Sequence, residues 1–169
     1  MSSLISNKRI QPFLRWAGGK TWLVNQLKKS TLSIEFNNYH EPFLGGGAMF
    51  FYLNPKTYSF LSDTNPRLIH AYQALKDDYE KVIEELKKFK NTREYYYSIR
   101  ERKFKNPWKK AAKFIFLNQT SFNGIYRENK KGEYNVPYGN KNVKIFDEYN
   151  LEKMSQSLIT TSLYCQDFE

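Results

Sequence analysis

Three consecutive glycines interrupt an apolar stretch early in the chain, and they constrain the fold more than any other feature. A short apolar run from Tyr39 to Leu44 leads into Gly45-Gly46-Gly47. A second apolar run, Ala48 to Leu53, follows the glycines without any helix breaker. Glycine allows positive φ angles and lets a ligand approach the main chain. The pattern therefore predicts a strand, a sharp turn and a buried helix, as at the start of an α/β unit.

An acidic residue follows this glycine turn at an informative distance. The stretch from Thr57 to Leu61 predicts a second strand, and Asp63 closes it 22 residues after Glu41. A carboxylate at the end of the second strand, about 20 residues past a glycine turn, typically accepts hydrogen bonds from ribose hydroxyls. The two features favour a nucleoside-type cofactor, although glycine turns also occur for structural reasons alone. A Walker loop is excluded, because the Gly-Gly-Lys-Thr run is preceded by Leu14 where that motif requires glycine.

The rest of the chain is dominated by helical periodicity. Amphipathic patterns predict helices over residues 20–30, 68–75, 79–89, 92–103, 108–118 and 151–157. Residues 119–144 are polar and contain Gly and Pro, which predicts a long loop or hairpin. A last short strand is expected over residues 162–165.

This order of elements predicts an α/β fold in which a sheet is interrupted by a separate lobe. We expect a partial Rossmann-like core over residues 1–65 and 146–169. We expect residues 66–145 to form a helical, loop-rich insert between the two parts of that core.

The chain is strongly basic, and its basic residues gather in the expected insert. Lys and Arg number 27 against 17 Asp and Glu, which gives a net charge of +10. Such a charge attracts nucleic acid or an acidic membrane surface, but it also occurs on ordinary basic proteins. The density of cations in the insert favours a surface that faces phosphates over a merely solvated one. These cations are Lys87, Lys88, Lys90, Arg93, Arg100, Arg102, Lys103, Lys105, Lys109, Lys110 and Lys113.

Composition excludes several other classes of protein. The chain is 40% hydrophobic and 17% aromatic, which argues against global disorder. Its mean hydropathy of −0.72 and the lack of a long apolar run exclude a transmembrane helix. The first residues lack the order of a signal peptide, and the single Cys165 cannot form an internal disulfide. We therefore expect a cytoplasmic protein without membrane partners, and we expect no metal site.

Several sequence blocks together resemble the Dam-like DNA adenine N6-methyltransferases. The blocks are Phe13–Lys20 (FLRWAGGK), Glu41–Gly47 (EPFLGGG), Ser62–Asn65 (SDTN), Asn118–Arg127 (NQTSFNGIYR) and Gly132–Gly139 (GEYNVPYG). They span most of the chain in the order that the family shows. The resemblance implies a site-specific enzyme that transfers a methyl group from S-adenosyl-L-methionine to adenine N6 in double-stranded DNA, of the kind found in restriction-modification systems.

The resemblance also assigns a cofactor site. It implies that Trp16 and Lys20 contact the methionine part of S-adenosyl-L-methionine and that Asp63 binds its ribose. Core packing is the alternative role of Trp16. Asp167 and Phe168 resemble the acid–aromatic pair that such enzymes place against the adenine of the cofactor. The expected cofactor-binding residues are Trp16, Lys20, Glu41, Phe43, Gly45, Gly47, Asp63, Asp167 and Phe168.

The insert contains the residues expected to read DNA. Arg127 can donate a fork of hydrogen bonds to guanine, and Asn123 can pair with adenine. Phe122 and Ile125 can wedge or stack where the target base leaves the helix, although the family usually has Tyr at the position of Phe122. Tyr138 completes the set and equally suits packing within a hairpin. Many family members recognise GATC, but the residues that determine specificity vary.

The catalytic Asp-Pro-Pro-Tyr motif of this family does not occur in the 169 residues. We therefore assign no catalytic residue and expect the isolated chain to transfer no methyl group. Three hypotheses follow: a fragment, one subunit of a split enzyme whose second polypeptide carries the catalytic half, or a non-catalytic DNA-binding module. An open sheet edge would favour such a partner or self-association.

Overall fold

The computed structural model describes residues 9–19, 22, 24, 26 and 37–168. Most of the helix expected over residues 20–30 lies outside these residues, and so does Lys20. Trp22, Val24 and Gln26 lie inside them and have helical backbone.

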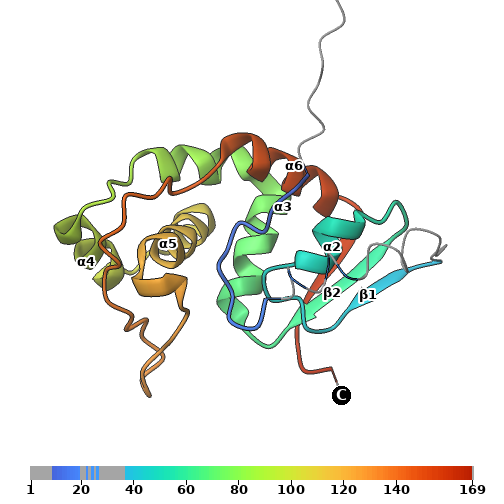
Figure 1. The fold of residues 1–169 in the computed structure, drawn as a ribbon, viewed down its shortest axis with the longest axis horizontal. Helices are drawn as coiled ribbons and strands as arrows, with labels where there is room; N and C mark the ends of the chain where they lie inside the picture. The colour runs from blue at the N-terminus through green and yellow to red at the C-terminus, as the bar shows by residue number, and fades with distance from the viewer. Residues whose placement is uncertain (1–8, 20–21, 23, 25, 27–36, 169) are drawn as a thin grey trace, which may run out of the picture.

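Three parallel strands form one small sheet (Figure 1). Strands β1 (Tyr39–Glu41), β2 (Ser59–Asp63) and β3 (Thr161–Cys165) are adjacent in the order of the sequence. Parallel strands need crossover connections. Helix α2 (Ala48–Leu53) connects β1 to β2, and a long, mainly helical excursion connects β2 to β3. This mixed α/β architecture confirms the expected fold class.

The register of the strands places the two acids of the sequence motif on one face of the sheet. Glu41 is opposite Leu61, and Leu61 is opposite Leu163. Side chains two residues apart in a strand point to the same face, so Asp63 shares the face of Leu61. Leu61 is fully buried, which identifies this face as the one that the helices cover.

The excursion between β2 and β3 contains four helices and a short 3₁₀ helix, η1, in the described part of the chain. They are α3 (Pro66–Lys87), α4 (Arg93–Glu101), α5 (Pro107–Thr120), η1 (Phe122–Gly124) and α6 (Glu148–Leu158). Helix α3 packs against α5 and α6 and also contacts β2 and β3. It therefore stands between the sheet and the outer helices (Figure 1). The backbone leaves the helical conformation at Asp78, which explains why the sequence shows two separate periodic stretches.

Side chains just before the longer helices fix where these helices begin. Asn65, Thr92, Asn106 and Asp147 each accept a hydrogen bond from a backbone N–H of the following first turn. A cap of this kind contributes about 1 kcal/mol.

Large aromatic side chains join the glycine region to α3 in the core. The ring of Tyr72 is fully buried and meets Phe13 edge-on at 5.1 Å. It also stacks near Phe51 of α2 at 6.2 Å. Burial of each such side chain stabilises the fold by about 1.5–3 kcal/mol.

The loop region expected over residues 119–144 is an open hairpin. Two isolated antiparallel bridges join Ser121 to Tyr138 and Glu128 to Tyr134. The hairpin and the carboxyl ends of the strands lie toward the same end of the molecule (Figure 1). Among the described helices, none combines the length and the apolar character needed to cross a bilayer.

Candidate functional site

The glycine turn joins β1 to α2 and leaves no room for side chains. Gly47 has a φ of +67°, in the left-handed region. A Cβ atom on Gly47 would lie 2.7 Å from Phe51 and 2.9 Å from the hydroxyl of Tyr72. A Cβ atom on Gly45 would lie 2.8 Å from the indole of Trp16. The predicted strand, turn and helix are thus confirmed, and the turn depends on glycine for both conformation and space.

Asp63 ends β2 beside this turn, and its carboxylate binds backbone on both sides. One oxygen accepts a hydrogen bond from the N–H of Gly45 at 3.0 Å. The other accepts one from the N–H of Asn65 at 2.9 Å. Asp63 therefore ties the turn after β1 to the loop after β2, in addition to the ribose role that the resemblance implies.

The carboxylate of Glu41 is directed beneath the turn. Its Oε2 atom accepts hydrogen bonds from the hydroxyl of Tyr39 at 2.9 Å and from the N–H of Phe50 at 3.1 Å. Phe50 is in the first turn of α2, and Gly47 has no side chain to cap that helix. Glu41 supplies the missing cap from a strand. Burial raises the pKa of Glu41 to about 7.

The indole of Trp16 connects the glycine turn to the insert. It stacks on Tyr126 with ring centroids 5.3 Å apart, and it is tilted against Phe114 at 6.2 Å. It is half-buried and also lies against Gly45, as the close approach at that glycine shows. Three parts of the chain that are far apart in the sequence therefore meet on one ring.

A cavity of about 380 Å³ opens beside Trp16. It lies between the segment 11–19 and the start of α2, and Gly46 and Ala48 form part of its wall. Small-molecule sites usually have volumes of about 300–1,000 Å³. The cavity can therefore hold part of a ligand that also lies along the glycine turn.

An exposed aromatic pair lies where the strands end. The rings of Phe43 and Phe168 are 5.0 Å apart, and the two side chains are 69% and 60% exposed. Asp167 accepts a hydrogen bond from the N–H of Phe168. Phe43, which precedes the glycines, therefore lies beside Phe168 of the acid–aromatic pair. The two rings form an exposed apolar surface.

The turn after α5 presents apolar side chains to the surface. Phe122 is 51% exposed and Ile125 is 41% exposed. Asn123 lies between them with a φ of +55°, a conformation that Asn tolerates better than most residues. An amide flanked by two exposed apolar groups can enter a groove of DNA.

Arg15 is an exposed residue that the sequence patterns did not single out. Its backbone N–H donates to Oδ1 of Asn118 at 2.8 Å, and its carbonyl accepts from Nδ2 of the same residue at 2.8 Å. That amide also donates to the carbonyl of Gly124 at 3.1 Å. Arg15 is therefore held beside the turn of Phe122 and Ile125. The sequence feature that could have pointed to Arg15 is Asn118, a fully buried polar residue in an apolar helix.

Arg127 and Tyr138 differ in how far their polar groups are engaged. The Nε atom of Arg127 donates to Oδ1 of Asn135 at 2.8 Å, and the side chain stays exposed on the hairpin. The hydroxyl of Tyr138 donates to Oδ1 of Asn91 at 2.9 Å, and its ring packs on Tyr96 at 5.4 Å. These contacts of Tyr138 are those expected of a residue that packs within the hairpin.

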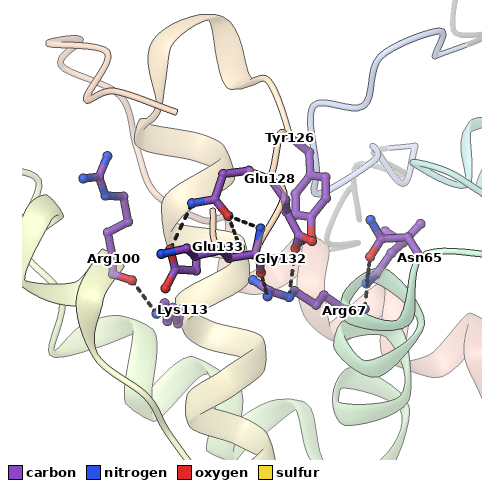
Figure 2. A network of polar contacts seen from close by, with 11 residues as sticks. Asn65, Arg67, Arg100, Lys113, Tyr126, Glu128, Gly132 and Glu133 are labelled. Carbon is purple, nitrogen blue, oxygen red and sulfur yellow. Dashed lines mark hydrogen bonds and ion pairs between the residues drawn. The ribbon is translucent and has the colours of Figure 1, made fainter. Parts of the chain in front are cut away.

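Arg67 fastens the hairpin to the start of α3 (Figure 2). Its Nε atom lies 3.0 Å from the carboxylate of Glu128, and its guanidinium donates to the carbonyl of Gly132. The hydroxyl of Tyr126 donates to the same carboxylate. One long side chain from another element therefore binds the hairpin at two positions, Glu128 and Gly132.

These contacts extend the hydrogen bonding from the glycine turn to the hairpin. The side chain of Asn65 accepts from the N–H of Arg67, and the N–H of Asn65 donates to Asp63. Asp63 in turn accepts from the glycine turn, and Arg67 binds Glu128. The candidate cofactor region and the candidate DNA-reading region are thus parts of one polar network.

A parallel sheet with a glycine turn and a strand-end acid is an arrangement typical of α/β proteins that bind nucleoside-type cofactors. Residues 16–169 match the model of the D12 class N6 adenine-specific DNA methyltransferases. The chain is 44% identical to the Type II methyltransferase M.MjaIII of Methanocaldococcus jannaschii, over 95% of this chain and 63% of that protein. It is 35% identical to the DNA adenine methylase of Haemophilus influenzae, over 99% of this chain and 60% of that protein. The chain therefore belongs to the D12 class N6 adenine-specific DNA methyltransferase family, and it spans about three-fifths of these curated relatives.

Proposed function

We propose that this chain is the cofactor-binding and DNA-reading part of a site-specific DNA adenine N6-methyltransferase. The observation that carries the proposal is the position of Trp16, whose ring contacts both the glycine turn and Tyr126 of the hairpin. A methyl donor bound at the turn and a base held near the hairpin would therefore both lie next to the ring of Trp16. Relatives named Type II methyltransferases support a role in restriction-modification.

The residues around the turn fit S-adenosyl-L-methionine. Gly45 and Gly47 carry no side chain over the main chain, and Asp63 supplies carboxylate oxygens for the ribose. Phe43 and Phe168 offer an apolar platform for the adenine. When bound, the cofactor supplies a methyl group on a positively charged sulfur.

The other cofactor assignments follow from the family motifs. We assign the methionine part to Trp16 and Lys20, and we place Asp167 beside the adenine. Glu41 is proposed to act through the turn, because its carboxylate already binds the N–H of Phe50 and the hydroxyl of Tyr39.

The hairpin is proposed to read double-stranded DNA. Arg127 and Asn123 would donate to base edges, since both are exposed and of the type that pairs with guanine and adenine. Phe122 and Ile125 would occupy the space near the base that leaves the helix. Arg15 extends this surface, because Asn118 holds it beside the same turn.

We further propose that the isolated chain binds both ligands without transferring the methyl group. Transfer requires groups that hold the extrahelical N6 amine in line with the methyl, and the Asp-Pro-Pro-Tyr motif is absent from the 169 residues. A second polypeptide with that motif would complete the enzyme, and such a partner or self-association would also cover an open edge of the sheet. The rival, a non-catalytic DNA-binding module, leaves the cavity beside Trp16 and the exposed pair of Phe43 and Phe168 without a ligand.

Two measurements on the chain test this proposal. Titration calorimetry with S-adenosyl-L-methionine should give saturable heat, and a folded protein that gives none would support the DNA-binding module instead. Tritium from labelled cofactor should not reach adenine-containing duplex DNA with the chain alone. Incorporation above background by the purified chain would show that other residues supply the chemistry.

A further inference from the structure

A pocket of about 410 Å³ lies between the start of α3, the α4–α5 connection and α5. Its walls include the aromatic side chains of Phe104, Phe114 and Tyr126. Its lining contains five Lys and Arg residues and His70, and no Asp or Glu. The five are Arg67, Arg102, Lys103, Lys110 and Lys113. A concave site with charge of one sign favours an anionic ligand.

Two of these cations, Arg67 and Lys113, are already engaged within the protein. Arg67 is paired with Glu128 at 3.0 Å. The Nζ atom of Lys113 donates to the carbonyls of Arg100 and Arg102, at 2.7 Å for Arg100. Figure 2 shows Lys113 and Arg67 on α5 and α3, below the hairpin. Burial, together with the nearby charge of Arg67, lowers the pKa of Lys113 to about 8. Both side chains are therefore held in place before any ligand binds.

The other three cations form the rim and are free to bind. Arg102, Lys103 and Lys110 are exposed, and their side chains have no ion pair or hydrogen bond within the described part of the chain. Lysines at the far end of α3 behave differently. Lys87 pairs with Glu148 at 2.9 Å, and Lys88 pairs with Glu85 at 2.7 Å. Arg102, Lys103 and Lys110 thus differ from Lys87 and Lys88, whose charges are already balanced by an acid.

The position of the pocket indicates which anion it serves. Tyr126 forms part of its wall and lies in the chain between Ile125 and Arg127, which are proposed to read DNA. Pro66 and Arg67 are the first residues of α3, which begins at the end of the molecule where the hairpin projects (Figure 1). Contacts to phosphates commonly fix the register of a protein on DNA, while other side chains read the bases.

We propose that this pocket holds a backbone phosphate of the DNA strand next to the hairpin, with Arg102, Lys103 and Lys110 as its donors. The proposal rests on the proposed DNA-reading function and adds to it a specific anchoring site. Arg67 and Lys113 add fixed positive charge to the site, and the aromatic walls accommodate the adjoining sugar.

The test compares two double variants with the same loss of charge. Lys103→Gln with Lys110→Gln removes two rim cations. Lys105→Gln with Lys109→Gln removes two cations from the same segment that do not line the pocket. Binding to duplex DNA is followed by fluorescence anisotropy at several salt concentrations. The rim variant should reduce the salt slope by about one for each phosphate that the protein no longer neutralises. It should weaken binding equally for all sequences, whereas the control variant should change the slope little.

The possible results separate this proposal from the function on which it rests. Equal effects of both double variants would show a diffuse basic surface and overturn the phosphate site. Lys103→Arg with Lys110→Arg should restore the salt slope, and failure to do so would also contradict the proposal. Titration with AMP provides a further arm: saturable binding that only the rim variant abolishes, with DNA affinity unchanged, would assign the pocket to free nucleotides. A wild-type chain that binds no duplex would overturn the DNA function itself. Thermal unfolding followed by circular dichroism checks that each variant is folded.

Discussion

The glycine turn and the recognition hairpin are built in opposite ways. At the turn, acidic side chains bind the backbone: Asp63 and Glu41 accept hydrogen bonds from main-chain N–H groups. In the hairpin, side chains such as Phe122 point outward, and Arg67 provides the fastening from another element. The turn is therefore defined by its main chain and should tolerate few substitutions. The surface of the hairpin can vary while the fold is kept, as is usual for loops that determine specificity.

Matched glycine substitutions in the two regions should give the largest difference. Gly47→Ala combines a left-handed backbone with overlap at 2.7 Å and 2.9 Å, so the free energy of unfolding should fall by about 3 to 4 kcal/mol. Gly132→Ala in the hairpin has a φ of +72°, but its nearest neighbour is 3.9 Å away. Only the conformational term of about 1 kcal/mol should apply there. Urea unfolding measures both, and equal losses would contradict the contrast between the two regions.

The buried acid beneath the turn should make stability depend on pH. The pKa of Glu41 is raised from 4.5 to about 7, so the folded state favours its protonated form. The stabilising contribution is fully present below pH 4.5 and is lost as pH rises through 7. The shift corresponds to about 3 kcal/mol. In Glu41→Gln, unfolding free energies measured between about pH 5 and pH 8 should vary less than in the wild type, and parallel profiles would exclude Glu41 as the source.

Local chemistry made the glycine turn predictable from the sequence. The order of strand, glycines and helix, the caps and the position of Asp63 all depend on neighbouring residues. Strand β2 begins at Ser59, two residues later than expected, because pairing with β1 and β3 decides where it starts. The hairpin contacts are likewise determined by residues far away in the sequence. Asn118 binds Arg15 and Arg67 binds Glu128 across large sequence separations, and no local pattern predicts such pairs.

Asp63→Asn tests whether Asp63 binds the cofactor in addition to its hydrogen bonds with the backbone. Loss of a charged acceptor should weaken the binding of S-adenosyl-L-methionine by about 2 kcal/mol. The amide oxygen can keep one of the two backbone hydrogen bonds, so the protein should remain folded. Calorimetric titration measures the affinity, and Asn135→Ala in the hairpin is the control. Unchanged affinity in folded Asp63→Asn would restrict Asp63 to a structural role.

Arg67→Ala should have the smallest effect on stability and the most local one. The pair between Arg67 and Glu128 is partly exposed, with side-chain exposures of 46% and 28%, so its loss should lower the unfolding free energy by about 0.2–1 kcal/mol. Hydrogen exchange of the amides of residues 126–134 should nevertheless accelerate, because Arg67 binds both Glu128 and the carbonyl of Gly132 within that segment. Amides of the glycine turn should keep their protection, since Asp63 and Glu41 bind them without Arg67.

A double-mutant cycle separates the ion pair from the other contacts of Arg67. If Arg67 acts through Glu128, the double variant Arg67→Ala with Glu128→Gln should accelerate hairpin exchange no more than Arg67→Ala alone. Additive effects would instead assign the fastening to the hydrogen bond with the carbonyl of Gly132. Faster exchange in the glycine turn as well would contradict the separation of the two regions. The hydrogen-bonded chain through Asn65 would then transmit changes from the hairpin to the cofactor site, and Arg67→Ala should also weaken cofactor binding.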